Sequence, residues 1–414
     1  MPRSLIERFA TPVVFDALAD SRVVGLLGPR QSGKSTLARD IIGPRWPAEY
    51  LTLDDESTRR AALEDPTGFI AHIRGAAIID EIQRAPGLML TIKARVDRDD
   101  RPGQFLITGS ANLQRISTVQ DALPGRVDYI SLWPLSQAEI AGGDDGLLDR
   151  LLDGVIPDLE GAPIGPSAYL QRFEAGGFPG VFAKPTRTRQ RFFEGYVASI
   201  VERDVPDLAH LRAVDGPARL LRLLAGRSAG LLNLASLARE LQLDEKTVAG
   251  HFRILENLML VRRHRPWFAN LGSRQTKAPK AYITDTGLMT ALAGTSGPSM
   301  LGSVLETGVV MEIVRLAASA RSRVDLLHYR DSKQREVDIV LENADRSVVG
   351  IEVKAGATVS RGDFHGLAYL RDRLGPRFKA GLVLCTGERT LPFGEGLAAV
   401  PISALWAGSQ APGA

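Results

Sequence analysis

Five short apolar runs in the first third of the chain end in polar or acidic residues. Runs of this kind are typical of buried parallel strands, whose functional side chains gather at their C-terminal ends. The predicted strands are Val23–Leu27, Glu49–Asp54, Gly75–Glu81, Gly103–Ser110 and Val127–Leu132. They predict an α/β domain with a parallel sheet over residues 1–140.

Three helices are predicted between residues 217 and 260. Apolar side chains recur at helical spacing along the last helix and form its buried face. These positions are Val248, Phe252, Leu255 and Leu258. Asp244 precedes this helix and is expected to cap it. Two predicted strands follow, Met259–Arg265 and Ala281–Thr284, which makes the pattern that of a winged helix.

The last third of the chain predicts one amphipathic helix and three strands. These elements are Leu305–Leu316, Leu326–Arg330, Arg335–Leu341 and Val348–Lys354. Segments rich in Gly, Pro, Asp or Ser separate the folded parts. The expected division is an α/β domain at 1–140, a connector with a helical segment at 141–215, a winged-helix domain at 216–295, a second α/β domain at 296–408 and a tail at 409–414.

Composition narrows the class of protein without pointing to a partner. A chain of 414 residues is too long for one ordinary core. The net charge of +3 is small for that length, so any affinity for nucleic acid must come from a local patch. Cys385 is the single cysteine, which excludes an intrachain disulfide. The charged N-terminus and the lack of a long apolar run favour a cytoplasmic protein without a membrane span.

The segment from Gly28 to Ser35 carries the clearest chemistry. It reads G-x-x-x-x-G-K-S between a predicted strand and a predicted helix, which is the context of a phosphate-binding loop. Its backbone N–H groups are expected to surround ATP or ADP phosphates, with Lys34 on the β- and γ-phosphates and Ser35 on Mg²⁺. The predicted nucleotide-binding residues are Gly28, Pro29, Arg30, Gln31, Ser32, Gly33, Lys34, Ser35 and Thr36.

Two carboxylates end the third predicted strand. Asp80 is expected to bind Mg²⁺ together with Ser35, and Glu81 is the candidate general base that orients the attacking water. The alternative is an ordinary solvated strand end. The phosphate-binding loop upstream favours the functional interpretation.

Two further positions are candidates for hydrolysis. Ser110, at the tip of the fourth strand, could sense the γ-phosphate or the water, with Thr108 and Asn112 as alternatives to it and a capped turn as the structural alternative. Arg126 could act as an arginine finger, in cis or from a neighbouring subunit of a homo-oligomer. A surface arginine in a turn is the alternative for Arg126.

Several motifs together resemble one group of bacterial and archaeal AAA-type ATPases. These proteins carry a C-terminal nuclease-like domain of unknown function. The matching segments are Gly28–Ser35, Ile78–Gln83, Leu106–Ser110, Pro124–Arg126, Trp133–Ser136 with Glu139, Gly176–Pro179, Glu202–Asp204 and Ala278–Leu288. The resemblance implies an AAA-type core. It also matches Arg30 to an arginine often found in this loop, whereas Asp285 is interpreted as a helix cap.

The winged-helix pattern offers a surface for DNA. Basic residues on the last helix and on the wing are expected to contact phosphates. They are Lys246, His251, Arg253, Arg262, Arg263 and Arg265. The alternative is a winged helix that serves only protein contacts, because a fold does not fix a function.

The C-terminal domain contains an acid followed by a Glu-x-Lys strand. Strand alternation puts Glu352 and Lys354 on one face, where Asp338 of the neighbouring strand could share Mg²⁺ with Glu352. Lys354 would then hold or deprotonate the attacking water, and Glu306 would add an acidic contact. The pattern resembles the PD-(D/E)xK, restriction-endonuclease-like fold, although Val337 replaces the proline. A plain salt bridge on a solvated strand is the alternative.

The combined prediction is an ATP-dependent switch coupled to a DNA-binding or nuclease-like C-terminal region. The alternative is a non-enzymatic regulatory or scaffold protein that holds a nucleotide and binds a partner through its C-terminal domain.

Overall fold

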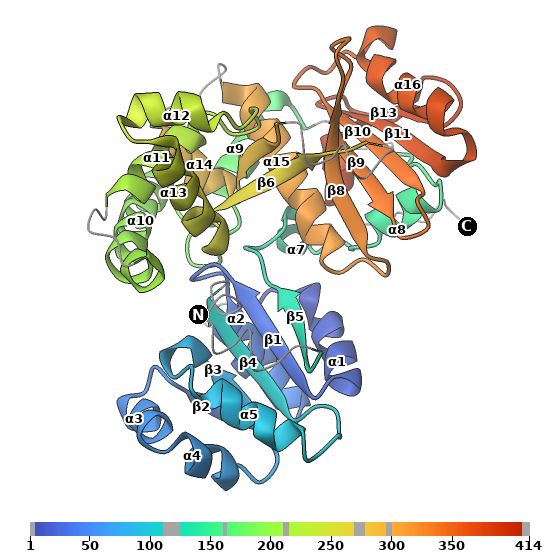
Figure 1. Ribbon diagram of the computed structural model, residues 1–414. Coiled ribbons are helices and arrows are strands. Elements are labelled where there is room, and N and C mark those ends of the chain that lie inside the picture. Colours follow the sequence, from blue (N-terminus) through green and yellow to red (C-terminus); the bar gives the residue numbers. More distant parts are fainter. Residues whose placement is uncertain are drawn as a thin grey trace. The chain divides into compact units, whose positions relative to one another are not determined.

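The computed structural model describes residues 5–110, 125–159, 164–209, 215–268, 278–294 and 300–407, with only the backbone for 201–209. The chain forms two compact units (Figure 1). The first contains Met1–Pro134 and Asn257–Met259, and the second contains Leu135–Glu256 and Leu260–Ala414. Among the described helices, none has the length and apolar character needed to cross a membrane.

Among the described residues of the first unit, five parallel strands form a sheet in the order β2–β3–β4–β1–β5. They are β1 (Val23–Gly28), β2 (Ala48–Thr52), β3 (Ala76–Asp80), β4 (Phe105–Ser110) and β5 (Val127–Ser131). The predicted parallel sheet is therefore confirmed, and the unit has the P-loop AAA-type α/β fold. Because β4 lies between β1 and β3, the C-terminal ends of these three strands meet at one edge of the sheet.

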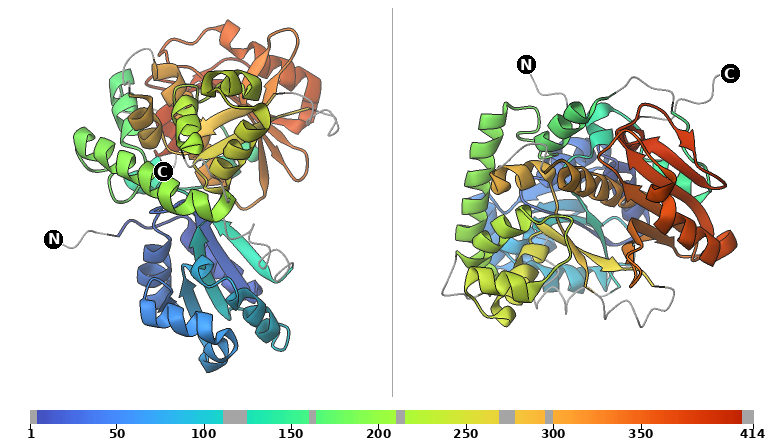
Figure 2. Two further views of the ribbon diagram at one scale, coloured as in Figure 1. Left: turned by 60° about the vertical axis from the view of Figure 1, so that its left-hand side comes forward. Right: turned by 90° about the horizontal axis from the view of Figure 1, so that it is seen from above.

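Helices cover both faces of this sheet (Figures 1 and 2). Alternate side chains of β1 point to opposite faces. Val24 and Leu26 join a buried cluster with α1, whereas Val23 and Leu27 join another with α5. The helices are α1 (Ala10–Asp20), α3 (Glu56–Glu64), α4 (Pro66–His72) and α5 (Leu88–Val96). Burial on both faces explains why the strands are continuously apolar.

The second unit contains the remaining α-helices that the structure describes, apart from the short helix that follows the phosphate-binding loop. Its helices are α7 (Gln137–Ala141), α8 (Leu147–Leu152), α9 (Pro166–Ala175), α10 (Thr186–Ala209), α11 (Gly216–Ala225), α12 (Leu234–Leu241), α13 (Glu245–Asn257), α14 (Thr286–Ala293), α15 (Leu301–Ala317) and α16 (His365–Leu374). Figure 2 shows the long helix α10, which packs against α11 and α14. Helix α8 lies inside the predicted connector and helical segment of residues 141–215, and its four leucines are buried.

In the described part of the second unit, eight strands form one mixed sheet in the order β12–β13–β11–β10–β9–β8–β6–β7. The strands are β6 (Val261–Pro266), β7 (Lys280–Ile283), β8 (Val324–Arg330), β9 (Glu336–Asn343), β10 (Val348–Val353), β11 (Phe378–Cys385), β12 (Leu391–Pro392) and β13 (Leu397–Pro401). The hairpin β6–β7 is antiparallel, and β6 also pairs in parallel with β8. The predicted wing strands therefore belong to the same sheet as the C-terminal strands.

Asp285 ties distant parts of the second unit together. It caps α14 by accepting a hydrogen bond from the Leu288 N–H at 3.0 Å, as predicted. Its other oxygen accepts one from the Gly177 N–H at 2.7 Å. The Arg315 guanidinium lies 3.6 Å from the same oxygen, and Asp285 is fully buried. At Gly176, where φ is +68°, a Cβ would overlap the Asp285 carboxylate, which explains the glycine.

Replacement of Asp285 by Ala is expected to lower the free energy of unfolding of the second unit by about 3 kcal/mol, because it leaves two buried backbone N–H groups without an acceptor and removes a carboxylate that pairs with the Arg315 guanidinium. Asp244 caps α13 from an exposed position, through the Thr247 N–H. Asp244→Ala is the matched control and is expected to cost about 1 kcal/mol. Urea unfolding followed by circular dichroism measures both. Equal losses in the two variants would contradict this account.

Candidate functional site

The phosphate-binding loop leaves β1 at its C-terminal end. Gly33 has a φ of +98°, a left-handed conformation that glycine adopts without strain. At Gly28 a Cβ would overlap the main-chain oxygen of Leu132 and crowd the Ser32 hydroxyl, so only glycine fits there. The Ser32 side chain is fully buried beneath the loop. The two glycines of the motif are thus required by backbone geometry.

Lys34 begins the helical segment after the loop. A short helix, α2 (Lys34–Thr36), continues as a π-helix at Leu37–Ile42, so the predicted helix is present with a wider last part. The Lys34 side chain is buried, and its ammonium donates to the main-chain oxygens of Gly28 and Pro29 at 3.1 and 2.9 Å. Both of these acceptors are uncharged main-chain groups of the loop itself, which places the ammonium beside the loop.

Asp80 gathers hydroxyl groups from three elements at the end of β3. Its Oδ1 accepts from the Ser35 hydroxyl at 3.0 Å and from the Thr108 hydroxyl. Its Oδ2 accepts from the Tyr50 hydroxyl at 3.0 Å. Burial and this carboxylate raise the pKa of Tyr50. A carboxylate beside the loop hydroxyl suits Mg²⁺, which prefers oxygen ligands and retains several waters.

Glu81 has a left-handed backbone, with φ at +61°, directly after Asp80. The side-chain amide of Gln83 makes both contacts: its N–H donates to the Glu81 carboxylate, and its Oε1 accepts from the Ser110 N–H at 3.4 Å. The Glu81 N–H donates to Thr108 Oγ1 at 3.2 Å. Gln83 therefore links the candidate base to the tip of β4. This link was not identified from the sequence, where Gln83 was only part of a motif.

The three candidates for the sensor position have different surroundings. Thr108 contacts Asp80 directly. Ser110 pairs with Gly28 in the register of β4 and β1, which places its backbone beside the start of the loop. Asn112 lies outside the described residues. A sensor role for Ser110 stays a prediction.

Arg126 lies at the N-terminal end of the strands, whereas the phosphate-binding loop lies at their C-terminal end. It precedes β5, whose first residue Val127 is level with Val23, the first residue of β1. The five residues from there to Gly28 span about 17 Å of strand. Arg126 instead forms an ion pair with Asp97 at the end of α5. An action in cis does not fit this position, whereas an action from a neighbouring subunit stays a prediction.

Arg8, which precedes α1, contacts the phosphate-binding loop. Its buried guanidinium donates to the main-chain oxygen of Ser32 at 3.0 Å and to that of Trp133 at 2.7 Å. These acceptors are 24 and 125 residues away along the chain. No local pattern could have predicted such a contact.

The predicted DNA-contacting residues divide into exposed and occupied groups. Lys246, Arg253 and Arg265 are exposed. Arg263 pairs with Glu256 at 3.0 Å and lies over the Phe252 ring, and Arg262 is half-buried. His251 was expected on the exposed face, but it is buried against Gly216. The correction follows from helical spacing, because residue 251 is three positions after the buried Val248.

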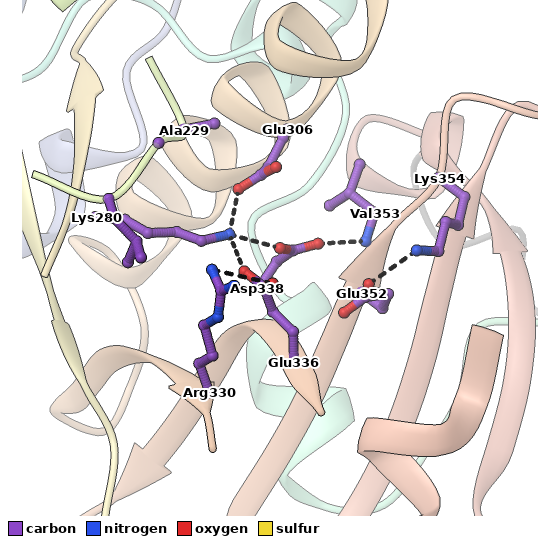
Figure 3. Close-up of a pocket in the computed structure, with 11 residues that line it drawn as sticks. Ala229, Lys280, Glu306, Arg330, Glu336, Asp338, Glu352, Val353 and Lys354 are labelled. Carbon is purple, nitrogen blue, oxygen red and sulfur yellow. Dashed lines mark hydrogen bonds and ion pairs between the residues drawn. The ribbon is translucent and has the colours of Figure 1, made fainter. Parts of the chain in front are cut away.

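A pocket of about 340 Å³ opens in the second unit, beside the predicted nuclease-like residues (Figure 3). Asp338, Glu352 and Lys354 all line it, together with Glu306. Lys354 donates to Glu352 at 3.0 Å, and Asp338 accepts from the Val353 N–H at 3.0 Å. The predicted residues are thus brought together around one pocket.

Lys280 was not predicted to belong to this group. It begins β7, it is buried, and its ammonium lies 2.8 Å from an oxygen of each of Glu306, Glu336 and Asp338. Tyr282 also donates to Glu306 at 2.8 Å. The three carboxylates raise the pKa of Lys280, although burial alone would lower it. The sequence showed Lys280 and Tyr282 only as part of a family motif.

The carboxylates of the pocket are unequal. Burial, with the Asp338 charge, raises the pKa of Glu306 to about 7 and that of Glu352 to about 8. Lys280 lowers the pKa of Glu336 despite its partial burial. Glu352 Oε2 is buried without a hydrogen-bond partner among the described atoms. Burial thus opposes the ionised form of Glu352, whereas the Lys354 ammonium favours it.

The arrangement around Lys280 does not suit a shared divalent ion. An ammonium already lies among the carboxylates that such an ion would use. Across the described ranges, no three His, Cys, Asp or Glu side chains are placed to hold a metal. A Mg²⁺ ion held by Asp338 and Glu352 stays a prediction, and Lys280 argues against it.

Comparisons with known proteins assign parts of the chain to families. Residues 20–141 match a model described as an AAA domain. Residues 167–299 and 301–405 match two models described as domains of unknown function. Two relatives are 31% identical over 392 residues, which cover 93% of this chain and 81% of theirs. They are the uncharacterized proteins Mb2031c of Mycobacterium bovis and Rv2008c of Mycobacterium tuberculosis.

Among solved structures, a RuvB variant of Thermotoga maritima is similar to the chain at 18% identity. The match covers 61% of this chain and 86% of RuvB, with a TM-score of 0.26. That score is too low to support any conclusion about this chain. The P-loop fold rests instead on the strand order and on the loop geometry.

Glu352→Gln is expected to change the pH dependence of stability. A carboxyl whose pKa rises from about 4.3 when unfolded to a higher value when folded stabilises the fold most at low pH. That contribution is lost as the pH rises through about 8. The melting temperature of the wild type, minus that of Glu352→Gln, should therefore fall between about pH 5 and pH 9.

The exposed Glu388 provides the control, as Glu388→Gln. Its difference from the wild type should stay flat over the same range. A flat difference for Glu352→Gln as well would show that Glu352 is not perturbed.

Proposed function

The chain belongs to the same family as Rv2008c and Mb2031c, and we propose that it is a Mg²⁺-dependent ATPase whose nucleotide site acts as a switch. The AAA-domain match over residues 20–141 supports ATP as the ligand. The observation that carries the proposal is the meeting of Lys34, Ser35, Asp80 and Glu81 at one edge of the sheet.

Each of these residues would have a separate task. The loop N–H groups and the Lys34 ammonium bind the phosphates. The Ser35 hydroxyl and the Asp80 carboxylate, 3.0 Å apart, hold Mg²⁺ directly or through water. When bound, the ion would neutralise charge on the phosphate oxygens.

Glu81 is proposed to accept the proton of the attacking water. Its left-handed backbone turns the side chain out of the strand direction, and Gln83 holds its carboxylate. A carboxylate that must meet a water at a defined point benefits from such a constraint, because orientation contributes much of the rate. Gln83 is thus a positioning residue in this proposal.

Lys34→Ala and Glu81→Gln are both expected to reduce turnover strongly, but for different reasons. The first should lose nucleotide binding. The second should bind ATP and hydrolyse it about 10²–10⁴-fold more slowly, since it lacks the base. Phosphate release under multiple turnover measures both, with nucleotide binding followed separately.

Lys333→Ala and Glu388→Gln replace exposed residues of the second unit and provide matched controls for the two variants. They should hydrolyse ATP at the wild-type rate. If Lys34→Ala and Glu81→Gln were as active as these controls, the ATPase proposal would fail. ATP binding without turnover in the wild type would favour the scaffold function instead.

We further propose that the nucleotide switch controls a DNA-binding region, which is formed by α11, α12, α13 and the hairpin β6–β7. Three helices followed by an antiparallel hairpin support a winged-helix interpretation. The exposed Lys246, Arg253 and Arg265 supply charge for phosphate contacts. The proposal does not extend to strand cleavage, because the Lys280 ammonium already lies among the carboxylates that a metal ion would use.

The variant Lys246→Glu/Arg253→Glu/Arg265→Glu should weaken binding to duplex DNA and flatten its dependence on salt. Each lost phosphate contact should reduce the slope of log K against log salt by about 0.9. Fluorescence anisotropy over a salt series measures this. The matched control carries the same charge change at the exposed Lys333, Arg361 and Arg389. If both variants bind alike, the DNA surface lies elsewhere or is absent.

A homo-oligomer and a cytoplasmic location complete the proposal. Arg126 lies far from the loop of its own chain, so an arginine finger at this position would serve the site of a neighbouring subunit. The single, buried cysteine is compatible with a reducing compartment.

A further inference from the structure

The pocket beside β9 and β10 contains a nearly complete balance of charge. Its acidic residues are Glu306, Glu336, Asp338 and Glu352, and its basic residues are Lys280, Arg330 and Lys354. Fully ionised, the group carries a formal charge of −1. Addition of a divalent cation would reverse that to +1.

Lys280 is the centre of this balance (Figure 3). An ammonium has three N–H donors, and three carboxylates lie at hydrogen-bonding distance from it. Its distances to Glu306, Glu336 and Asp338 are equal, at 2.8 Å. The carboxylates come from α15 and β9, so the lysine on β7 joins three elements. The three carboxylates thus surround one cation, the Lys280 ammonium.

A divalent ion would compete for the same oxygens. Mg²⁺ needs oxygen ligands at about 2.0–2.1 Å in octahedral geometry. Asp338 directs one oxygen to Lys280 and the other to the Val353 N–H. Two cations sharing one buried carboxylate would repel each other strongly, because the surrounding dielectric constant is low.

We propose that the Lys280 ammonium takes the place of a divalent metal ion in this acidic pocket. The pocket therefore keeps its carboxylates together without metal, and it does not support metal-dependent cleavage of nucleic acid. Lys354 and Glu352 form a neighbouring ion pair rather than half of a metal site. Lys280 also holds the edge hairpin β6–β7 to α15 and β9.

The test measures Mn²⁺ binding to the full chain, freed of nucleotide and metal, by electron paramagnetic resonance of free Mn²⁺. The wild type and Asp338→Asn should bind the same amount of Mn²⁺, because no Mn²⁺ is held by Asp338 in the wild type. Lys280→Met keeps the length of the side chain and removes its charge. It should gain about one Mn²⁺ per chain, held by carboxylates, and lose it again in Lys280→Met/Asp338→Asn.

Thermal unfolding gives a second measurement. Lys280→Met should melt below the wild type, and Mn²⁺ should raise its melting temperature while leaving that of the wild type unchanged. Lys280→Arg retains the charge and should neither gain Mn²⁺ nor respond to it. A Lys280→Met chain as stable as the wild type and without an Mn²⁺ site would overturn the proposal.

The wild type decides the question even if Lys280→Met does not fold. Mn²⁺ bound by the wild type and lost in Asp338→Asn would show that a metal occupies the pocket beside Lys280. Cleavage of DNA by the wild type that requires Mn²⁺ and disappears in Asp338→Asn would overturn the proposal equally.

Discussion

The Asp80 carboxylate is the interaction on which the nucleotide site depends. It lies buried at the end of β3 and accepts hydrogen bonds from Ser35 after β1, Tyr50 on β2 and Thr108 on β4. Four adjacent parts of the sheet edge are therefore fixed relative to one another. Burial of an acid is costly unless its oxygens are satisfied, and three hydroxyls provide that here. The same geometry leaves the carboxylate beside the loop hydroxyl, where a Mg²⁺ ion would be needed.

Two buried lysines show how surroundings decide what a cation can do. Lys34 donates to neutral main-chain oxygens of its own loop. Lys280 lies among three carboxylates, which compensate its positive charge. In our proposal the first lysine binds nucleotide phosphates, whereas the second stabilises the fold. Both are nearly inaccessible, so burial alone does not distinguish a binding lysine from a structural one.

Local patterns predicted the elements, and long-range contacts were beyond them. The strands of the first unit, the phosphate-binding loop and the caps at Asp244 and Asp285 depend on residues close in sequence, and all were predicted. Arg8, Tyr50 and Lys280 act through partners that are 24 to 125 residues away, and none was identified. His251 was misplaced although its spacing from Val248 marks the buried face, because its polarity suggested exposure.

The identity of the nucleotide retained by the chain tests the central claim most directly. The chain would be incubated with labelled ATP and Mg²⁺, desalted rapidly, and the retained nucleotide separated by chromatography. If Glu81 is the general base of this site, the wild type should retain ADP and Glu81→Gln should retain ATP in similar amount. The same proportion of ATP to ADP in both chains would contradict the account.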